Sequence, residues 1–167
     1  QPLKVEASDF RVQVGEGERT HSMSVLNISG TAFGSVSPPA ILALNTGAHI
    51  AGWSHNTGEG GISSPHISGG GDIIWQVASG YFGCRSKDGQ FNHENFRTKA
   101  AAEQIRMIEI KLSQGAKPGH GGMLMGAKVS PEIARIRGIE VGQDCISPPS
   151  HSAFSTPREL LEFAQQL

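Results

Sequence analysis

The stretch Ile108–Glu132 reads IEIKLSQGAKPGHGGMLMGAKVSPE and holds the strand and loop around which the fold is organised. Apolar residues alternate with charged ones from Ile108 to Leu112, a pattern that predicts a short strand running into a buried sheet. The segment Gln114–Gly126 then places several glycines around Lys117 and carries too little apolar material for a core element. We expect a loop whose backbone N–H groups can approach an anion closely while the lysine supplies charge.

A short helix is expected directly after this loop. Ser130 stands at the N-cap position and Pro131 at the first helical position, so residues 133–137 should be helical. A strand, a glycine loop and a helix in this order are typical of a ligand site at the carboxyl end of a parallel strand. The stretch therefore predicts an α/β fold with a binding site at the loop.

Segments of strand and helix character alternate along the rest of the chain, with residues 62–72 as an irregular exception. The pattern indicates strands at 25–28 and 73–78, loops at 29–35, 55–61 and 145–155, and helices at 40–47 (capped by Ser37 and Pro38), 94–104 and 156–163. Such alternation predicts parallel βα units, here about four, whereas a complete (β/α)8 barrel needs about 250 residues. We therefore expect the first half of a TIM barrel over residues 23–167. Residues 1–22 should form an N-terminal arm with a strand at 10–14.

Composition excludes several classes of protein. The 167 residues suffice for one domain, and 14 Lys and Arg balance 15 Asp and Glu, so neither a nucleic-acid nor a membrane partner is expected. Cys84 and Cys145 have no CxxC spacing, which favours a reducing, cytoplasmic location over a disulfide framework. The seven histidines show no zinc-site spacing, so no metal site is expected. Because no initiator methionine is present, we expect a segment of a longer protein.

Several motifs, kept in order from about Met23 onward, resemble one known family. The run KLSQGAKPGHGGMLMGAKVSPEIARIRGI (111–139), the later ISPP (146–149) and SHNTGEGG (54–61) are similar to the FMN-binding synthase domain of glutamate synthases and their shorter relatives. The resemblance implies an FMN-dependent oxidoreductase that reductively aminates 2-oxoglutarate, through 2-iminoglutarate, to L-glutamate. It also implies that this chain supplies the first four barrel strands. The amidotransferase domain and the iron–sulfur cysteines of full glutamate synthases are not in these residues.

Three charged residues are the main candidates for chemistry. Lys117 resembles the lysine that serves the flavin and the oxo acid in the family; its alternative is a solvated loop lysine. Lys111, at a strand end, needs a countercharge, which an anionic flavin edge could supply. An ion pair with Glu109 or Glu59 is the alternative. Glu59 resembles the glutamate that lines the synthase site, and its alternative is a surface carboxylate.

Four further candidates rest on the resemblance alone. Gly34 and Ser35 resemble the backbone cradle under the flavin and substrate, and Gln76 and Ser79 resemble polar strand-end residues near the cofactor. Each of the four could equally be a turn residue or satisfy the core. Together with Lys111 and Lys117 they make up the predicted cofactor site, and Lys117 and Glu59 the predicted catalytic pair.

The sequence departs from the family pattern at five positions: Thr31, Ala32, Tyr81, His120 and Met123. The changes at Thr31, Ala32 and Met123 remove polar contacts that a flavin and oxo-acid site would use. This leaves two alternatives open, namely a flavin enzyme acting on another oxo or imino compound, and an inert half-barrel that only self-associates. The expected partners are a small 2-oxo acid and either the missing C-terminal half-barrel or a second copy of the chain.

Overall fold

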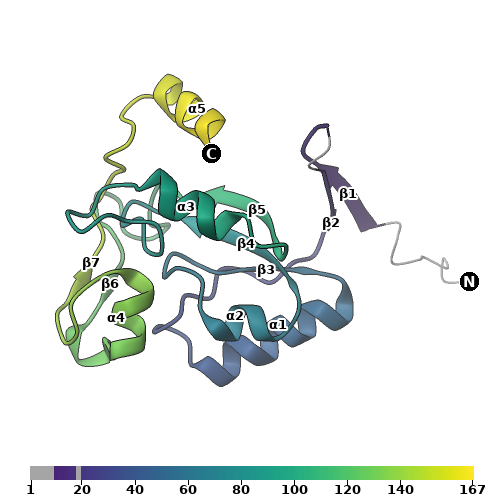
Figure 1. Cartoon of the computed structure of the whole chain (residues 1–167), viewed down its shortest axis with the longest axis horizontal. Helices are drawn as coiled ribbons and strands as arrows, with labels where there is room; N and C mark the ends of the chain where they lie inside the picture. Colours follow the sequence, from purple (N-terminus) through teal and green to yellow (C-terminus); the bar gives the residue numbers. More distant parts are fainter. Residues whose placement is uncertain (1–9, 18–19) are drawn as a thin grey trace, which may run out of the picture.

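A three-stranded parallel sheet forms the centre of the structure, a computed structural model that describes residues 10–17 and 20–167 (Figure 1). The strands, in sheet order, are β3 (Ser54–Asn56), β4 (Asp72–Val77) and β5 (Ile105–Ile110), all parallel. The predicted strand at 73–78 is confirmed as β4. The strand predicted at 108–112 is confirmed as β5 in part, because β5 begins at Ile105 and ends at Ile110. The fold is mixed α/β, as the alternation predicted, and the described residues form no closed barrel.

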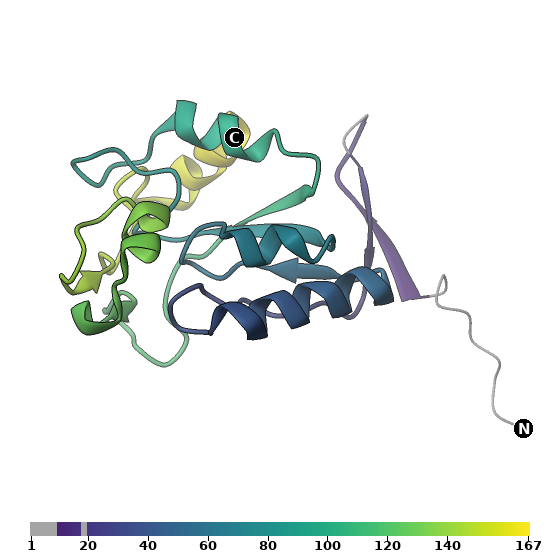
Figure 2. The same cartoon turned by 60° about the horizontal axis from the view of Figure 1, so that its bottom comes forward.

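Helix α1 (Pro38–Ala51) precedes the first strand of the sheet, and α2 (Ser64–Ser68) and α3 (His93–Ala100) follow β3 and β4. Helices α1 and α2 lie side by side in both views (Figures 1 and 2). The buried side chain of Asn45 helps hold them, because its Oδ1 accepts a hydrogen bond from the Gly71 N–H at 3.0 Å. Helix α3 covers β4 through Phe96, whose ring stacks on Trp75 with 5.1 Å between ring centroids.

Several predicted boundaries are wrong. Residues 25–28 form no strand: the Val25 N–H donates to the Phe10 carbonyl beside the hairpin, Leu26 is exposed, and Ile28 bridges to β3. The region 62–72 contains helix α2, which its short length hid from the sequence pattern. Helix α1 continues to residue 51, and α3 ends at residue 100. Ser37 occupies the N-cap of α1, but its hydroxyl forms no capping hydrogen bond.

An antiparallel hairpin precedes the sheet. Its strands are β1 (Arg11–Val14) and β2 (His21–Ser24), and β1 confirms the predicted strand at 10–14. Arg11 donates from Nη1 to the carbonyl of Gly52, 2.8 Å away, which ties the hairpin to the end of α1. The first nine residues of the predicted arm lie outside the described residues.

A small subdomain follows β5 and lies at the lower left of Figure 1. It consists of β6 (Met123–Leu124), the 3-10 turn η2 (Gly126–Lys128), α4 (Pro131–Arg137) and β7 (Cys145–Ile146), with β6 and β7 antiparallel. Helix α4 confirms the predicted helix, and the Ser130 hydroxyl accepts from the Ile133 N–H at 3.3 Å. Ile133 and Leu124 pack with Phe33 and Phe82 in one core cluster, whereas Trp75 and Phe96 belong to a second.

The chain closes with α5 (Pro157–Gln166). Thr156 and Glu159 form the predicted capping box, in which the Thr156 hydroxyl accepts from the Glu159 N–H at 3.2 Å. The helix is anchored by Phe163, whose ring lies 4.9 Å from that of Phe91. Within residues 10–17 and 20–167, no helix is both long enough and apolar enough to cross a membrane.

Candidate functional site

The carboxyl ends of the three parallel strands meet at one edge of the sheet and bring polar side chains together. Asn56 ends β3, Gln76 lies near the end of β4, and Glu109 pairs with Gln76 across the β4–β5 register. Oε1 of Glu109 accepts from Asn56 Nδ2 at 3.0 Å and from the amide of Gln76. One carboxylate therefore links all three strands where a ligand site was predicted.

Lys111, directly after β5, forms the second cluster with Glu59 and Gln114. Its Nζ lies 3.1 Å from Oε2 of Glu59 and 3.0 Å from Oε1 of Gln114, and Nε2 of Gln114 donates to the same Glu59 oxygen at 2.6 Å. The side chains of Lys111 and Glu59 are 26% and 15% exposed, so the pair is largely shielded from water. The alternative that pairs Lys111 with Glu59 is thus what the structure shows, and Glu59 is no surface carboxylate.

Two glycines of the loop let the backbone approach this cluster. A Cβ added to Gly122 would overlap Oε1 of Glu59, and one added to Gly121 would overlap the carbonyl of Ser147. The Ser147 N–H donates to the Gly122 carbonyl at 2.8 Å, which holds the segment after β7 against the loop. A side chain at either position would therefore overlap a neighbouring group. The sequence predicted close backbone approach in this loop but not the positions that require glycine.

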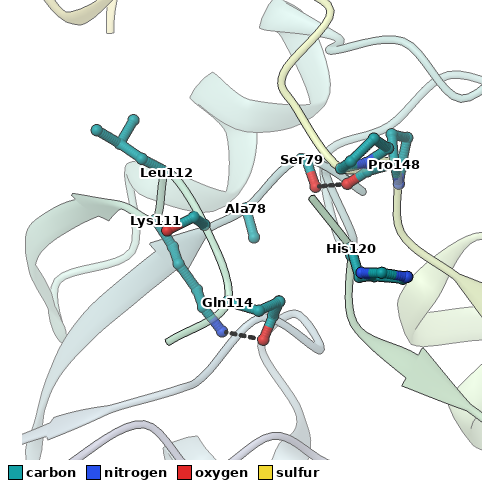
Figure 3. Close-up of a pocket in the computed structure, with 10 residues that line it drawn as sticks. Ala78, Ser79, Lys111, Leu112, Gln114, His120 and Pro148 are labelled. Carbon is teal, nitrogen blue, oxygen red and sulfur yellow. Dashed lines mark hydrogen bonds between the residues drawn. The ribbon is translucent and has the colours of Figure 1, made fainter. Parts of the chain in front are cut away.

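Ser79 and Lys111 border a small cavity of about 10 Å³ (Figure 3). Ser79 is buried and donates its hydroxyl to the Pro148 carbonyl at 2.5 Å. In Figure 3 the side chain of Lys111 reaches down to Gln114, and His120 and Pro148 lie on the opposite side of the cavity. The space admits only a group the size of a water molecule.

The structure does not bring Lys117 into this cluster. The residue is exposed, and its backbone forms two hydrogen bonds in the loop: its N–H donates to the Gln114 carbonyl at 3.3 Å, and its carbonyl accepts from the His120 N–H at 3.0 Å. In this arrangement Lys117 is the solvated loop lysine of the alternative. Its predicted role with the flavin and the oxo acid stays a prediction.

Gly34 and Ser35 also lie apart from the strand-end clusters. Gly34 has φ 96°, and an added Cβ would meet Ile133 and Leu124 at 3.0 and 3.1 Å, so it is packed beneath α4. Ser35 is exposed, and its N–H donates to the Ala32 carbonyl at 3.0 Å in a turn. Both positions fit the turn-and-core alternative, and their predicted place under a flavin is not tested by these contacts.

Sequence patterns did not predict the hydrogen bonds of Tyr81 and His151 behind Lys111. The buried Tyr81 hydroxyl accepts from the N–H groups of Ser152 and Ala153, at 3.1 and 3.0 Å, and donates to Nδ1 of His151 at 3.2 Å. His151 in turn donates from Nε2 to the Lys111 carbonyl at 2.8 Å, and burial lowers its pKa. This relay fixes the backbone that carries Lys111. The aromatic residue at a glycine-rich strand end was the available signal.

Two buried histidines, His55 of β3 and His66 of α2, lie with their ring centroids 5.3 Å apart. Nε2 of His55 lies 2.6 Å from the Thr31 hydroxyl, and His66 donates from Nε2 to the Thr31 carbonyl at 2.9 Å. Nδ1 of His66 accepts from the hydroxyl of Ser63 at 2.7 Å. Burial lowers the pKa of His55 to about 4 and lowers that of His66, so both are neutral near pH 7. In the part of the chain that the structure describes, no three His, Cys, Asp or Glu side chains gather as a metal site.

Comparison with known proteins gives one consistent result. Residues 4–167 match the family model described as a conserved region in glutamate synthase. The chain is 46% identical over 141 residues to the glutamate synthase large subunit-like protein YerD of Bacillus subtilis, covering 83% of this chain and 26% of that protein. It is 36% identical over 140 residues to the archaeal glutamate synthase [NADPH] of Methanocaldococcus jannaschii, covering 84% and 25%.

A longer relative aligns with nearly the whole chain. The glutamate synthase [NADPH] large chain of Bacillus subtilis is 33% identical over 172 residues, which cover 99% of this chain and 10% of that protein. The chain thus spans about a quarter of YerD and of the archaeal protein, and a smaller share of the large chain.

Proposed function

The chain belongs to the glutamate synthase family, and from this premise we propose that the native protein is an FMN-dependent oxidoreductase that reductively aminates 2-oxoglutarate to L-glutamate. The observation that carries the proposal is the convergence of Lys111, Gln114 and Glu59 at the carboxyl end of β5. Open α/β sheets bind their ligands at this edge. A cation held there by a carboxylate and an amide is suited to an oxygen-rich, anionic ligand.

The donors at this edge fit one side of a flavin. Lys111 offers an ammonium group and Gln114 and Gln76 offer amides, which suit the carbonyl oxygens of an isoalloxazine ring or a substrate carboxylate. Bound and reduced, FMN supplies the hydride for reduction of an imine. The cavity beside Ser79 and Lys111 is far too small for a flavin, so this donor set would form one wall of the site. We propose that further βα units of a barrel supply the others.

Glu59 sets the charge that a ligand would meet. In the present arrangement its carboxylate neutralises Lys111, and Gln114 bonds to both partners. An anionic ligand that approaches Lys111 therefore has to share or displace this contact, and a cationic or protonated group would be attracted to Glu59. Lys117 would reach such a ligand only after movement of the loop, so we assign it a supporting electrostatic role.

A related flavin-dependent enzyme with another oxo or imino substrate is the second candidate. The observation favouring it concerns two of the departures from the family pattern. The Thr31 hydroxyl is engaged with His55, and its carbonyl with His66, so this residue is committed to the interior. The Met123 side chain is 58% exposed and offers no polar group where the family has an amide. Specificity for 2-oxoglutarate would then have to come from other side chains.

We also propose that the open sheet is completed by a partner, either a C-terminal half-barrel or a second copy of the chain. Several large apolar side chains are exposed, among them Leu26, Ile50 and Leu112. Exposed apolar surface and unpaired strand edges favour association. Light scattering of the isolated chain measures its association, and binding of a hydrophobic dye measures its exposed apolar surface. A monomer that binds no dye would contradict the proposed association.

Flavin titration of the native protein, followed by fluorescence quenching, tests the functional proposal. We expect saturable FMN binding that Lys111→Ala weakens and the exposed control Lys128→Ala leaves unchanged. Glutamate formation is then measured with 2-oxoglutarate, ammonia and a reduced donor. Flavin binding without glutamate formation would favour the second candidate, and absence of flavin binding would overturn both.

A further inference from the structure

Four basic side chains line one cavity between α3 and α4, apart from the strand-end clusters. The cavity has a volume of about 210 Å³ and is lined by Arg85, Lys99, Arg135 and Arg137, together with Asn95, an isoleucine and two glycines. Helix α3 supplies Lys99 and α4 supplies the last two arginines, while Arg85 lies in the segment between β4 and α3. Its lining contains no acidic residue.

Arg137 is the most buried of the four, at 4% exposed. Its Nη2 donates to the Phe33 carbonyl at 2.9 Å, and Nη1 lies 3.6 Å from Sγ of Cys145. The guanidinium carbon lies 5.1 Å from the centre of the Phe82 ring, and Nε is buried without a hydrogen-bond partner. A full positive charge is thus held in the interior by one carbonyl, one thiol and a ring face.

The other cations are held close to it. The Arg85 guanidinium carbon lies 5.5 Å from the same Phe82 ring, and its Nε is also buried without a partner. Nζ of Lys99 donates to the Gly83 carbonyl. Burial lowers the pKa of Lys99, and the charge of Arg135 lowers it further. Both effects show that the ammonium lies in a partly desolvated and electropositive place.

No carboxylate compensates this charge among residues 10–17 and 20–167. The ion pairs within 4.0 Å that these residues form include none of the four cations. Glu140 and Asp144 line an adjoining cavity with Arg85 and Arg135, but neither comes within ion-pair distance of them. Oδ1 of Asp144 is engaged by the Gly126 N–H at 2.6 Å.

We propose that this cavity is a binding site for a phosphate-class oxyanion, separate from the proposed flavin and oxo-acid site. Uncompensated cations repel one another, and a multivalent oxyanion relieves the repulsion while accepting from the free donors. Arginines with fixed guanidinium planes are suited to phosphoryl oxygens, and Asn95 adds a neutral donor. The cavity is large enough for an inorganic phosphate or for the phosphoryl end of a small metabolite. It is an additional site because its lining includes none of Lys111, Glu59 and Gln114.

Calorimetric titration of the native protein with inorganic phosphate tests the proposal, at constant ionic strength maintained with chloride. Arg135 is exposed and the Lys99 ammonium is only partly buried, so Arg135→Gln and Lys99→Gln should leave the fold intact. Each is expected to weaken phosphate binding about tenfold, the loss of roughly one charge-assisted hydrogen bond. Arg97→Gln is the matched control, because Arg97 is exposed on α3 but does not line the cavity. This variant should bind phosphate as the unchanged protein does.

Lys111→Ala separates this site from the proposed active site. It should leave phosphate affinity unchanged even if flavin binding is lost. The proposal is overturned if the native protein shows no saturable phosphate binding in the presence of chloride. An acidic protein segment that filled the cavity would give the same result. It is equally overturned if both cavity variants bind phosphate as tightly as Arg97→Gln. A phosphomonoester that binds more tightly than inorganic phosphate would identify a metabolite as the occupant.

Discussion

The ammonium group of Lys111 lies 3.1 Å from Oε2 of Glu59, although 52 residues separate them in the chain. Removing one partner leaves a shielded charge uncompensated, so Glu59→Gln should lower the free energy of unfolding by about 1–3 kcal/mol. Urea denaturation measures this. The exposed pair of Arg158 and Glu162 provides a control, because Arg158→Gln should change stability by less than about 0.5 kcal/mol. Equal effects of the two substitutions would contradict the assignment.

Gly122 is expected to tolerate no side chain. A Cβ there would overlap the Glu59 carboxylate, so Gly122→Ala should displace Glu59 or the loop and destabilise the protein by about 1–3 kcal/mol. Gly115→Ala is a matched control in the same loop, since nothing lies within 4 Å of its added Cβ. Thermal unfolding of both variants distinguishes them. A Gly122→Ala protein as stable as Gly115→Ala would show that the close approach is not required.

Tyr81→Phe removes one hydroxyl and leaves two backbone N–H groups without their acceptor. We expect a loss of about 1–3 kcal/mol, together with faster hydrogen exchange at Ser152 and Ala153. The exposed hydroxyl of Ser68, which bonds within its own helix, serves for comparison: Ser68→Ala should change stability by less than about 0.5 kcal/mol. Unchanged exchange in Tyr81→Phe would contradict the role assigned to this hydroxyl.

Stability should fall in mild acid because of the buried histidines. The pKa of His55 is lowered from 6.5 to about 4, so the unfolded state takes up a proton first as the pH falls. The neutral state of His55 therefore makes no demand on the free energy of unfolding above about pH 6.5. By about pH 5, protonation of the unfolded state lowers this free energy by about 2 kcal/mol. His66 and His151 shift in the same direction. Urea unfolding at about pH 7.5 and about pH 5 should therefore show a smaller pH dependence in His55→Gln than in the exposed control His120→Gln.

Lys117→Ala tests a role that the contacts alone do not show. Since the side chain is exposed, its removal should change the free energy of unfolding by less than about 0.5 kcal/mol. If the lysine closes on the ligand, affinity for the 2-oxo acid should still fall about tenfold. Lys128→Ala, at another exposed lysine, is the control for nonspecific charge. Indistinguishable affinities of the two variants would assign Lys117 to the solvated surface.

The sequence predicted those elements whose local signals agree with their tertiary setting. Strand β4 carries an apolar run and β5 an alternation of apolar and charged residues, and α4 and α5 begin at Ser130-Pro131 and Thr156-Pro157. Helix α2 was missed because five residues are too few for a periodic pattern. Its N-terminus uses His66 where a glutamate or glutamine is the usual partner of the capping serine. The strand predicted from the apolar run at Val25 was wrong, because a short apolar run does not show whether a neighbouring strand lies beside it.

The candidate site was predicted in part. The sequence predicts Lys111 and Glu59 as site residues, with their pairing as one alternative. It does not predict the role of Gln114, which bonds to both, because nothing in the pattern distinguishes this residue at the edge of the expected loop. The relay through Tyr81 and His151 joins segments far apart in the chain, and no local pattern encodes such a contact.

The relay also orders events during synthesis of the chain. The Tyr81 hydroxyl finds its two amide donors 71 and 72 residues later, so a ribosome-bound chain ending before Ala153 leaves this buried oxygen without them. Contacts of such long sequence separation form late and slow the search for the native state. The glycine-rich segment after β4 therefore lacks these hydrogen bonds while the intervening residues emerge from the ribosome. A nascent chain stalled in that interval lacks these contacts, and partly folded chains of this kind are prone to misassembly.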